Sequence, residues 1–402
     1  MTYRSKVAAV YLLGFFLDLI NMFIASVAFP AMATALDASP ATLAWVSNGY
    51  IAGLTLAIPF SASLTRFFGA RRVFILSLGL FTLAGAAAGL TGSLESLIAW
   101  RIVQGMGGGL LIPVGQALTW QKFAPHERAR LSSLVMMIAL LAPAASPAVG
   151  GLLVQSFGWR WIFFAPLPPA LLTLLLAIVW LKNDEPVRLS GRWLHLPLLA
   201  NPLLRFSMLV YLCVPGMFIG VNLVSMFYLQ SVVKLAPGLT GALMLPWSAA
   251  SFAAIMATGK LFNRTGPRPL ILTGCLLQAA GIALLTLVGA APSHSLLIVA
   301  FALMGSGGSL CSSAAQSCAF LTIHHDDMPD ASALWNLNRQ LSFFAGATLL
   351  TLLLGQLQQH FSPLAAWHSI FFIAAAITLI PAVALLKFNN RRVVIDLQKE
   401  KQ

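Results

Sequence analysis

The sequence predicts an all-α integral membrane protein with twelve transmembrane helices in two pseudo-symmetric six-helix bundles. Composition is the first observation: 59% of the 402 residues are hydrophobic and 9% are charged, whereas soluble domains carry about 25% charged residues. Internal duplication is the second. The segments 62–72 (ASLTRFFGARR) and 259–268 (GKLFNRTGPR) are diverged copies of one basic loop. Parallel repeats of this kind are typical of secondary transporters.

Twelve apolar runs have the length of roughly 20 residues that is needed to cross a bilayer. The first six lie at 7–30, 43–61, 73–93, 96–120, 131–155 and 160–181, and the last six at 207–231, 239–260, 268–290, 295–321, 332–357 and 364–387. The apolar core of the first run is too long for a cleaved signal peptide. The runs define an N-terminal bundle at 1–181, a cytoplasmic linker at 182–206, a C-terminal bundle at 207–387 and a cytoplasmic tail at 388–402.

The duplication extends beyond the loops. Gly105 and Gln116 are matched by Gly305 and Gln316 at the same offset along the chain. The linker is charged, and it leaves room for a short amphipathic helix at the membrane surface around residues 193–199. The two bundles are therefore expected to be related copies joined by a solvated connection.

Charge predicts how the bundles are oriented. Twenty of the 24 Lys and Arg residues fall at the termini or in alternate loops on one side, and this side is expected to face the cytoplasm. Arg160 and Lys234 map to the other face, and Arg101 and Arg339 lie inside spans. We therefore expect a multi-pass protein of the inner membrane with both termini in the cytoplasm. The net charge of +13 is dispersed over loops, so it indicates topology rather than nucleic-acid binding.

One acidic residue lies deep inside a span. Asp18 is roughly 17 Å from the cytoplasmic edge at about 1.5 Å per residue, and a carboxylate at that depth is a functional hypothesis by default. Arg101 lies at a similar depth, five residues from the outer end of the fourth run. Opposed effects of this cation and of burial on the acid suit a carboxyl group that changes protonation state during a cycle. A purely structural ion pair is the alternative.

The sequence gives little support for metal binding, nucleotide binding or nucleophilic catalysis. The run His324-His325-Asp326-Asp327 could bind a metal, but a polar loop explains it equally well. The sequence contains neither a glycine-rich nucleotide loop nor a nucleophile elbow. We therefore expect no enzyme activity, no cofactor and no metal.

A series of motifs in order resembles the major facilitator superfamily, specifically its drug/proton antiporter branch, over nearly the whole chain. The motifs are Trp45-Val-Ser-Asn-Gly-Tyr50, the loop Ala62–Arg72, Arg101-Ile-Val-Gln-Gly105, Ser146-Pro-Ala-Val-Gly-Gly151, Trp159-Arg-Trp-Ile-Phe163 and Ala331–Gln340. The resemblance implies a monomer that exports a small amphipathic molecule, such as a drug or a siderophore-like metabolite, in exchange for protons. Protons and membrane lipid are its other implied partners.

The resemblance assigns candidate residues to three roles. Proton coupling falls to Asp18 and Arg101. The substrate cavity would be lined by Asn21, Met22, Phe23, Gln104, Asn222, Met226, Phe227, Ser312 and Gln316. Conformational motifs comprise Arg66, Gly69, Arg71, Gly105, Pro147, Gly150, Gly151, Gly259, Arg264, Gly266 and Arg339.

Two departures from the family pattern bear on mechanism. Its loop carries an acid three residues before the glycine, where this chain has Arg66 and Asn263, so the usual contact between that acid and a helix end is not expected in either copy. Arg66 is instead expected to join Arg71 and Arg72 in a cationic cluster that contacts anionic lipid. The first-span acid of the branch is replaced by Asn21, and Asp18 lies one turn away on the same face.

Two alternatives to proton-driven export stay open on the sequence. The first is an uptake symporter or facilitator of the same fold, against which the antiporter-like fifth run argues. The second is a membrane receptor or enzyme that transports nothing, and it would need an appended domain or site.

Overall fold

The structure is a computed structural model that describes residues 1–38, 40–182, 194–235, 239, 242–288, 293–385, 390 and 393. Every regular element in this described part is helical. Ten helical segments within it are long and apolar enough to cross a membrane, in agreement with the predicted all-α membrane class. The predicted spans 131–155 and 239–260 fall on two further helices, α7 (Pro125–Phe157) and α13 (Met244–Thr265), so the number twelve stays a prediction.

The chain divides into two compact units. Unit 1 comprises Met1–Phe123, Ile138–Leu198 and Ile323–Leu337, and unit 2 comprises Ala124–Met137, Leu199–Thr322 and Asn338–Gln402. Two of the boundaries, after Met137 and after Leu337, fall inside the 33-residue helices α7 and α16 (Met328–His360). The predicted bundles at 1–181 and 207–387 stay a prediction. Residues 183–193 of the predicted linker and most of the predicted tail lie outside the described residues.

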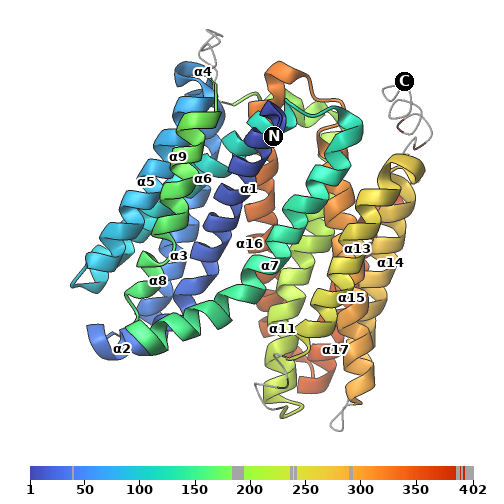
Figure 1. Cartoon of the computed structure of the whole chain (residues 1–402). Helices are drawn as coiled ribbons and strands as arrows, with labels where there is room; N and C mark the ends of the chain where they lie inside the picture. Colours follow the sequence, from blue (N-terminus) through green and yellow to red (C-terminus); the bar gives the residue numbers. More distant parts are fainter. Residues whose placement is uncertain are drawn as a thin grey trace. The chain divides into compact units, whose positions relative to one another are not determined.

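Unit 1 is built around α6 (Leu94–Trp120), which packs against α1, α3 and α5 (Figure 1). A helical turn η6 (His325–Asp327) leads into α16, whose first residues also belong to this unit. The other elements of unit 1 are α1 (Tyr3–Ile24), η1 (Ala25–Ala28), α2 (Phe29–Leu36), α3 (Pro40–Ala57), η2 (Ile58–Phe60), α4 (Ser61–Phe68), α5 (Ala70–Leu90), α8 (Trp161–Phe164) and α9 (Leu167–Trp180).

Glycines set the close crossing of α3 and α6. A Cβ atom on Gly105 of α6 would overlap the carbonyl oxygen of Tyr50, and one on Gly53 of α3 would overlap the carbonyl oxygen of Ile102. A lipid-embedded bundle gains no hydrophobic drive between helices, so close backbone approach supplies the packing energy. This crossing holds the functional side chains of the two helices at short range.

The duplicated loops share one backbone device. Gly69 has φ +82° and Gly266 has φ +76°, values that residues other than glycine rarely adopt. Each glycine ends one helix by donating its N–H to a carbonyl four residues earlier, Thr65 at 2.9 Å and Phe262 at 2.8 Å. Each also begins the next helix. The two copies therefore make the same sharp reversal.

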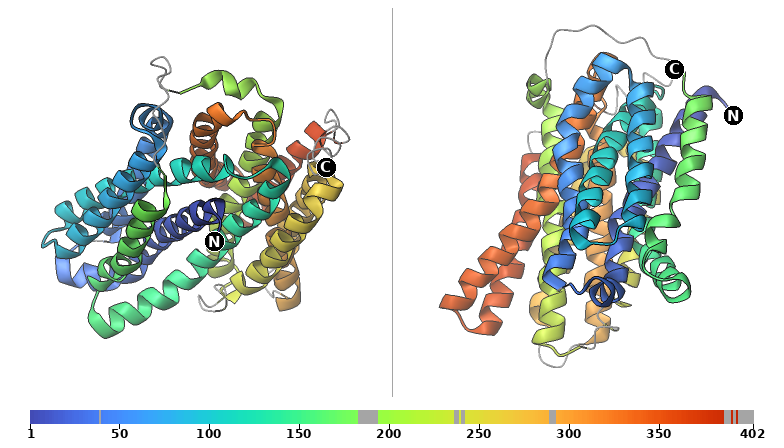
Figure 2. Two further views of the ribbon diagram at one scale, coloured as in Figure 1. Left: turned by 45° about the horizontal axis from the view of Figure 1, so that its top comes forward. Right: turned by 90° about the vertical axis from the view of Figure 1, so that its left-hand side faces the viewer.

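Unit 2 is centred on α15 (His294–Ala319), which packs against α13 and α14 (Pro267–Leu284); the three helices lie side by side in both figures (Figures 1 and 2). A surface helix was expected around 193–199. The structure has a short 3₁₀ helix there, η3 (Leu196–Ala200), and Trp193 lies outside the described residues. The remaining elements are α10 (Pro202–Tyr211), η4 (Leu212–Gly216), α11 (Met217–Ser231), η5 (Leu285–Leu287) and α17 (Pro363–Ala384).

A one-turn π-helix, η4, interrupts the path from α10 to α11. Pro215 lies inside this turn and removes a backbone donor. The side-chain amide of Gln278 on α14 donates to the carbonyl oxygen of Val214 at 2.8 Å. The Val214 carbonyl also accepts the backbone N–H of Met217, so the Gln278 amide is a second donor that ties α14 to the π-helical turn.

Candidate functional site

The predicted coupling residues Asp18 and Arg101 are both fully buried in unit 1. Their link runs through Tyr50 of α3. The Tyr50 hydroxyl donates to Oδ1 of Asp18 on α1, and the Arg101 guanidinium lies over the Tyr50 ring with Cζ 4.4 Å from its centroid. The two opposite charges therefore share one aromatic neighbour that hydrogen-bonds to the acid and stacks with the cation.

The hydrogen bonds of Arg101 hold α1, α3 and α6 together. Nε donates to the carbonyl oxygen of Val46 at 3.0 Å, and Nη2 donates to the carbonyl oxygen of Asn21 at 2.9 Å. Nη1 donates to Oε1 of Gln104 at 2.7 Å. Gln104 in turn donates to Oδ1 of Asn21 at 3.1 Å. The hydrogen-bond acceptors of Arg101 are thus all neutral. The Tyr50 side chain contacts both the Arg101 guanidinium and the Asp18 carboxyl group.

Gly108 makes room for the acid. A Cβ atom at this position of α6 would overlap Oδ1 of Asp18 and would lie 3.0 Å from the Tyr50 hydroxyl. Gly108 is the second residue of the Gly107–Gly109 run, for which no role was predicted from the sequence. Tyr50 closes a quoted motif but had no predicted role, because an aromatic residue in an apolar span is usually a packing residue.

The predicted cavity residues differ in exposure. In unit 1, Asn21 and Gln104 are 1% and 2% exposed and are bonded within the Arg101 network, whereas Phe23 is 38% exposed. Met22 is partly buried. In unit 2, Phe227 is exposed and Gln316 is buried, while the residues of intermediate burial are Asn222, Met226 and Ser312. Their role in a cavity stays a prediction.

A second buried amide pair lies in unit 1. Nδ2 of Asn336, on α16, donates to Oε1 of Gln116, on α6, at 2.6 Å. Gln116 was noted only as the repeat partner of Gln316, and Asn336 only as part of an eleventh-span motif. Within the described residues, Nε2 of Gln316 is buried without a hydrogen-bond partner. The two repeat-related glutamines therefore differ in their surroundings.

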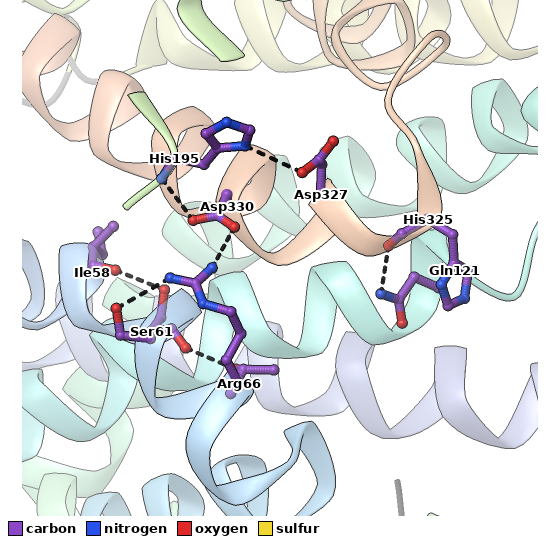
Figure 3. A network of polar contacts seen from close by, with 10 residues as sticks. Ile58, Ser61, Arg66, Gln121, His195, His325, Asp327 and Asp330 are labelled. Carbon is purple, nitrogen blue, oxygen red and sulfur yellow. Dashed lines mark hydrogen bonds and ion pairs between the residues drawn. The ribbon is translucent and has the colours of Figure 1, made fainter. Parts of the chain in front are cut away.

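The first basic loop makes an ion pair that the sequence did not predict. Nη1 of Arg66, at the end of α4, lies 2.5 Å from Oδ2 of Asp330, in the first turn of α16 (Figure 3). The two side chains are 15% and 5% exposed. A contact between the loop and a helix end, not expected here, does form with reversed sign: the acid is on the helix and the cation is on the loop. Asp330 is also well placed for the positive N-terminal end of α16.

Asp330 binds a second segment with its other oxygen. The backbone N–H of His195 donates to Oδ1 of Asp330 at 2.9 Å, and Nδ1 of His195 lies 3.2 Å from Oδ1 of Asp327 (Figure 3). Nearby, Gln121 at the end of α6 donates to the carbonyl oxygen of His325 at 3.0 Å. The start of α16 therefore joins α4, α6 and the segment after residue 193. We call Arg66, His195, Asp327 and Asp330 the polar junction.

The second basic loop makes an equivalent contact with different chemistry. Nδ2 of Asn263, which aligns with Arg66, donates to the carbonyl oxygen of His126 at the start of α7 at 2.5 Å. A Cβ atom on Gly259 would lie 2.6 Å from Oγ of Ser133, also on α7. Both loops thus contact the first turns of a 33-residue helix, one through an ion pair and the other through an amide.

The remaining predicted motif residues occupy varied settings. Arg71 donates to the carbonyl oxygen of Ile178 at 2.8 Å. A Cβ atom on Gly150 would lie 2.9 Å from the Ile24 side chain, whereas one on Gly151 would meet open space. Arg339 is 9% exposed on α16. Arg264 is exposed at the end of α13, and Pro147 lies inside α7. Within the described residues, no group of three or more His, Cys, Asp or Glu side chains is placed to hold a metal ion.

Residues 11–347 match the sequence model of the Major Facilitator Superfamily. The chain belongs to this superfamily. It is 26% identical over 410 residues to the multidrug resistance protein B homolog of Mycobacterium tuberculosis (strain H37Rv), covering 87% of this chain and 76% of that protein. It is 27% identical over 402 residues to the uncharacterized transporter YebQ of Escherichia coli K12, covering 86% and 88%.

Solved structures agree on the fold. The proton:xylose symporter XylE superposes with a TM-score of 0.74 at 16% identity, covering 96% of both chains. The human organic anion transporter MFSD10 superposes with a TM-score of 0.76 at 15% identity, covering 96% of this chain and 100% of that one. The protein is therefore a multi-pass major facilitator transporter rather than an enzyme, and its relatives lie in the drug efflux branch.

Proposed function

We propose that this transporter exports a small amphipathic molecule across the inner membrane in exchange for protons, with Asp18 as the proton carrier. The observation that carries the proposal is the contact of Asp18 with Tyr50 beneath Arg101. Asp18 is fully buried in a membrane span. A carboxyl group at this depth is costly and typically marks an ion or proton pathway.

The arrangement suits a carboxyl group that gains and loses a proton. Burial favours the neutral acid, whereas the nearby Arg101 charge and the Tyr50 hydroxyl favour the carboxylate. Arg101 is held by three hydrogen bonds that do not involve Asp18. Protonation of Asp18 therefore leaves the hydrogen bonds of Arg101 in place. The charge of the site can change while α1, α3 and α6 stay connected.

Relatives support the export direction. Similar proteins of Mycobacterium tuberculosis are described as multidrug resistance proteins and as a drug efflux pump. Our proposal extends this direction to the present chain, together with cytoplasmic termini and function as a monomer. The substrate would be bulky and partly apolar, because the candidate cavity residues combine methionine and aromatic side chains with a few amides.

Energised inverted vesicles test the proposal. We would add amphipathic dyes of positive, zero and negative charge, and record the internal pH with a fluorescent probe. Export by exchange predicts that a transported dye raises the internal pH of wild-type vesicles, while Asp18→Asn vesicles with equal protein show no response. Dye accumulation together with protons in right-side-out vesicles would instead establish uptake by symport.

A further inference from the structure

Three basic residues gather at one end of α9, at the same end of unit 1 as the start of α1. Nζ of Lys6, on α1, lies 5.7 Å from the centroid of the Trp180 ring at the end of α9. Nζ of Lys182 lies 5.1 Å from the centroid of the Tyr3 ring. Arg71, from α5, donates to the carbonyl oxygen of Ile178 at 2.8 Å. We call Lys6, Arg71 and Lys182 the α9 basic cluster.

Packing between helices holds the residues of the α9 basic cluster close together. α9 contacts both α1 and α5. The backbone N–H of Lys182 donates to the Tyr3 hydroxyl at 3.3 Å, so the chain leaving α9 is fastened to the start of α1. Tyrosine and tryptophan are the side chains that favour the boundary between lipid and water. The cluster therefore lies at headgroup depth if α9 spans the bilayer.

An apolar stripe leads away from the cluster along α9. Its members recur at helical spacing and are 46–67% exposed: Leu171, Leu172, Leu175, Ile178 and Val179. A surface of this kind in a membrane span contacts acyl chains. The stripe ends at Ile178 and Val179. The carbonyl oxygen of Ile178 accepts from Arg71, and Lys182 follows four residues after Ile178. A lipid lying along the stripe would therefore place its phosphate near these cations.

Arg66 does not take part, contrary to the expectation that it joins Arg71 and Arg72 in one cationic cluster. It is bonded to Asp330 at the polar junction. The cations that remain beside the membrane at this position come from three separate elements instead of one loop. Among the described side chains joined by these contacts, all the charged groups are basic.

We propose that the α9 basic cluster binds the headgroup of an anionic phospholipid whose acyl chain lies along the exposed stripe of α9. Charge complementarity selects the headgroup, since each Lys or Arg near an anionic membrane surface contributes roughly fivefold in affinity. The stripe supplies the apolar contact that distinguishes a lipid from free phosphate.

Lipid titration of the detergent-solubilised full chain, followed by native mass spectrometry, measures the affinity directly. Phosphatidylglycerol is the probe, and phosphatidylcholine is the zwitterionic reference. We expect tighter binding of phosphatidylglycerol, and a loss of about 25-fold in the double variant Lys6→Gln/Lys182→Gln, because two cations are neutralised. The matched control is Lys122→Gln at the end of α6, which should change the affinity by less than about twofold. An equal loss in this control, or no preference for phosphatidylglycerol, would overturn the proposal.

A second measurement needs no substitution, so it decides the matter even where the double variant fails to fold. Phosphatidylglycerol with a photoreactive acyl chain is added to the unmodified protein, irradiated and mapped by peptide mass spectrometry. We expect labelling within 171–180, and we expect excess inorganic phosphate to leave it unchanged. Labelling elsewhere would refute the site, and displacement by phosphate would mean that the cluster binds a free anion.

Discussion

Reversing the charges of Arg66 and Asp330 tests whether the polar junction holds α4 against the start of α16. Each single reversal, Arg66→Asp or Asp330→Arg, places like charges together in a setting that is 15% and 5% exposed. Breaking one partner of a fully buried pair costs about 3–5 kcal/mol, whereas exposed pairs contribute about 0–1 kcal/mol. The partial exposure of Arg66 places this pair between these limits, at about 2–3 kcal/mol. That range corresponds to an equilibrium shift of about 30- to 160-fold.

Hydrogen exchange of the protein in lipid nanodiscs measures this shift. Peptides covering α4 and the start of α16 should exchange about 30- to 160-fold faster in each single variant. They should return toward the wild-type rate in Arg66→Asp/Asp330→Arg, where the ion pair is restored. The backbone N–H of His195 gives an internal control, because its acceptor is Oδ1 of Asp330 and the double reversal does not restore that acceptor. Exchange that is equally fast in the single and double variants would refute a specific ion pair.

Four further predictions follow from the membrane-embedded contacts. Asp18→Asn should abolish transport driven by a proton gradient while membrane abundance stays unchanged, as inverted-vesicle assays and immunoblots would show; undiminished pumping would remove Asp18 from the mechanism. Tyr50→Phe keeps the ring beneath Arg101 but removes the hydroxyl donor, a hydrogen bond to a charged group worth about 1.5–3 kcal/mol, so it should impair proton-coupled transport more than downhill dye movement. Gly105→Ala should lower thermal stability by about 1–3 kcal/mol through overpacking against α3, whereas Gly151→Ala, which faces open space, serves as its neutral control. Gly69→Ala should cost about 1–3 kcal/mol through backbone strain at φ +82°; an unchanged melting temperature would show that the loop relaxes.

The sequence predicted the class of fold because lipid leaves few options. Long apolar runs can satisfy their backbone groups only as helices, so their length and composition were sufficient. The duplicated loops could also be recognised from the sequence, because the backbone conformation at each reversal favours glycine. The number twelve stays a prediction, because ten helical segments of the described part are long and apolar enough to cross a membrane.

Only some residues of the candidate site could be predicted from the sequence. Asp18 and Arg101 stood out because isolated charges inside apolar runs are rare. Their connection was not predictable, because Tyr50 lies on a third helix and its register against α1 and α6 depends on the glycine-mediated crossing. No role was predicted for Asp330. Its pairing with Arg66 requires two segments 264 residues apart in sequence to meet, and no local pattern encodes that meeting.

The two basic loops are diverged copies of one segment, so they can be compared with each other as homologues are. Where the backbone dictates the residue, both copies have kept it, as at Gly69 and Gly266. Where only a polar partner is needed, they have diverged, because Arg66 meets a carboxylate whereas Asn263 meets a peptide carbonyl. One copy is therefore sensitive to ionic strength and the other is nearly indifferent to it. Salt should weaken the contact of the first loop selectively, so that a change in solution conditions acts on the two repeats unequally.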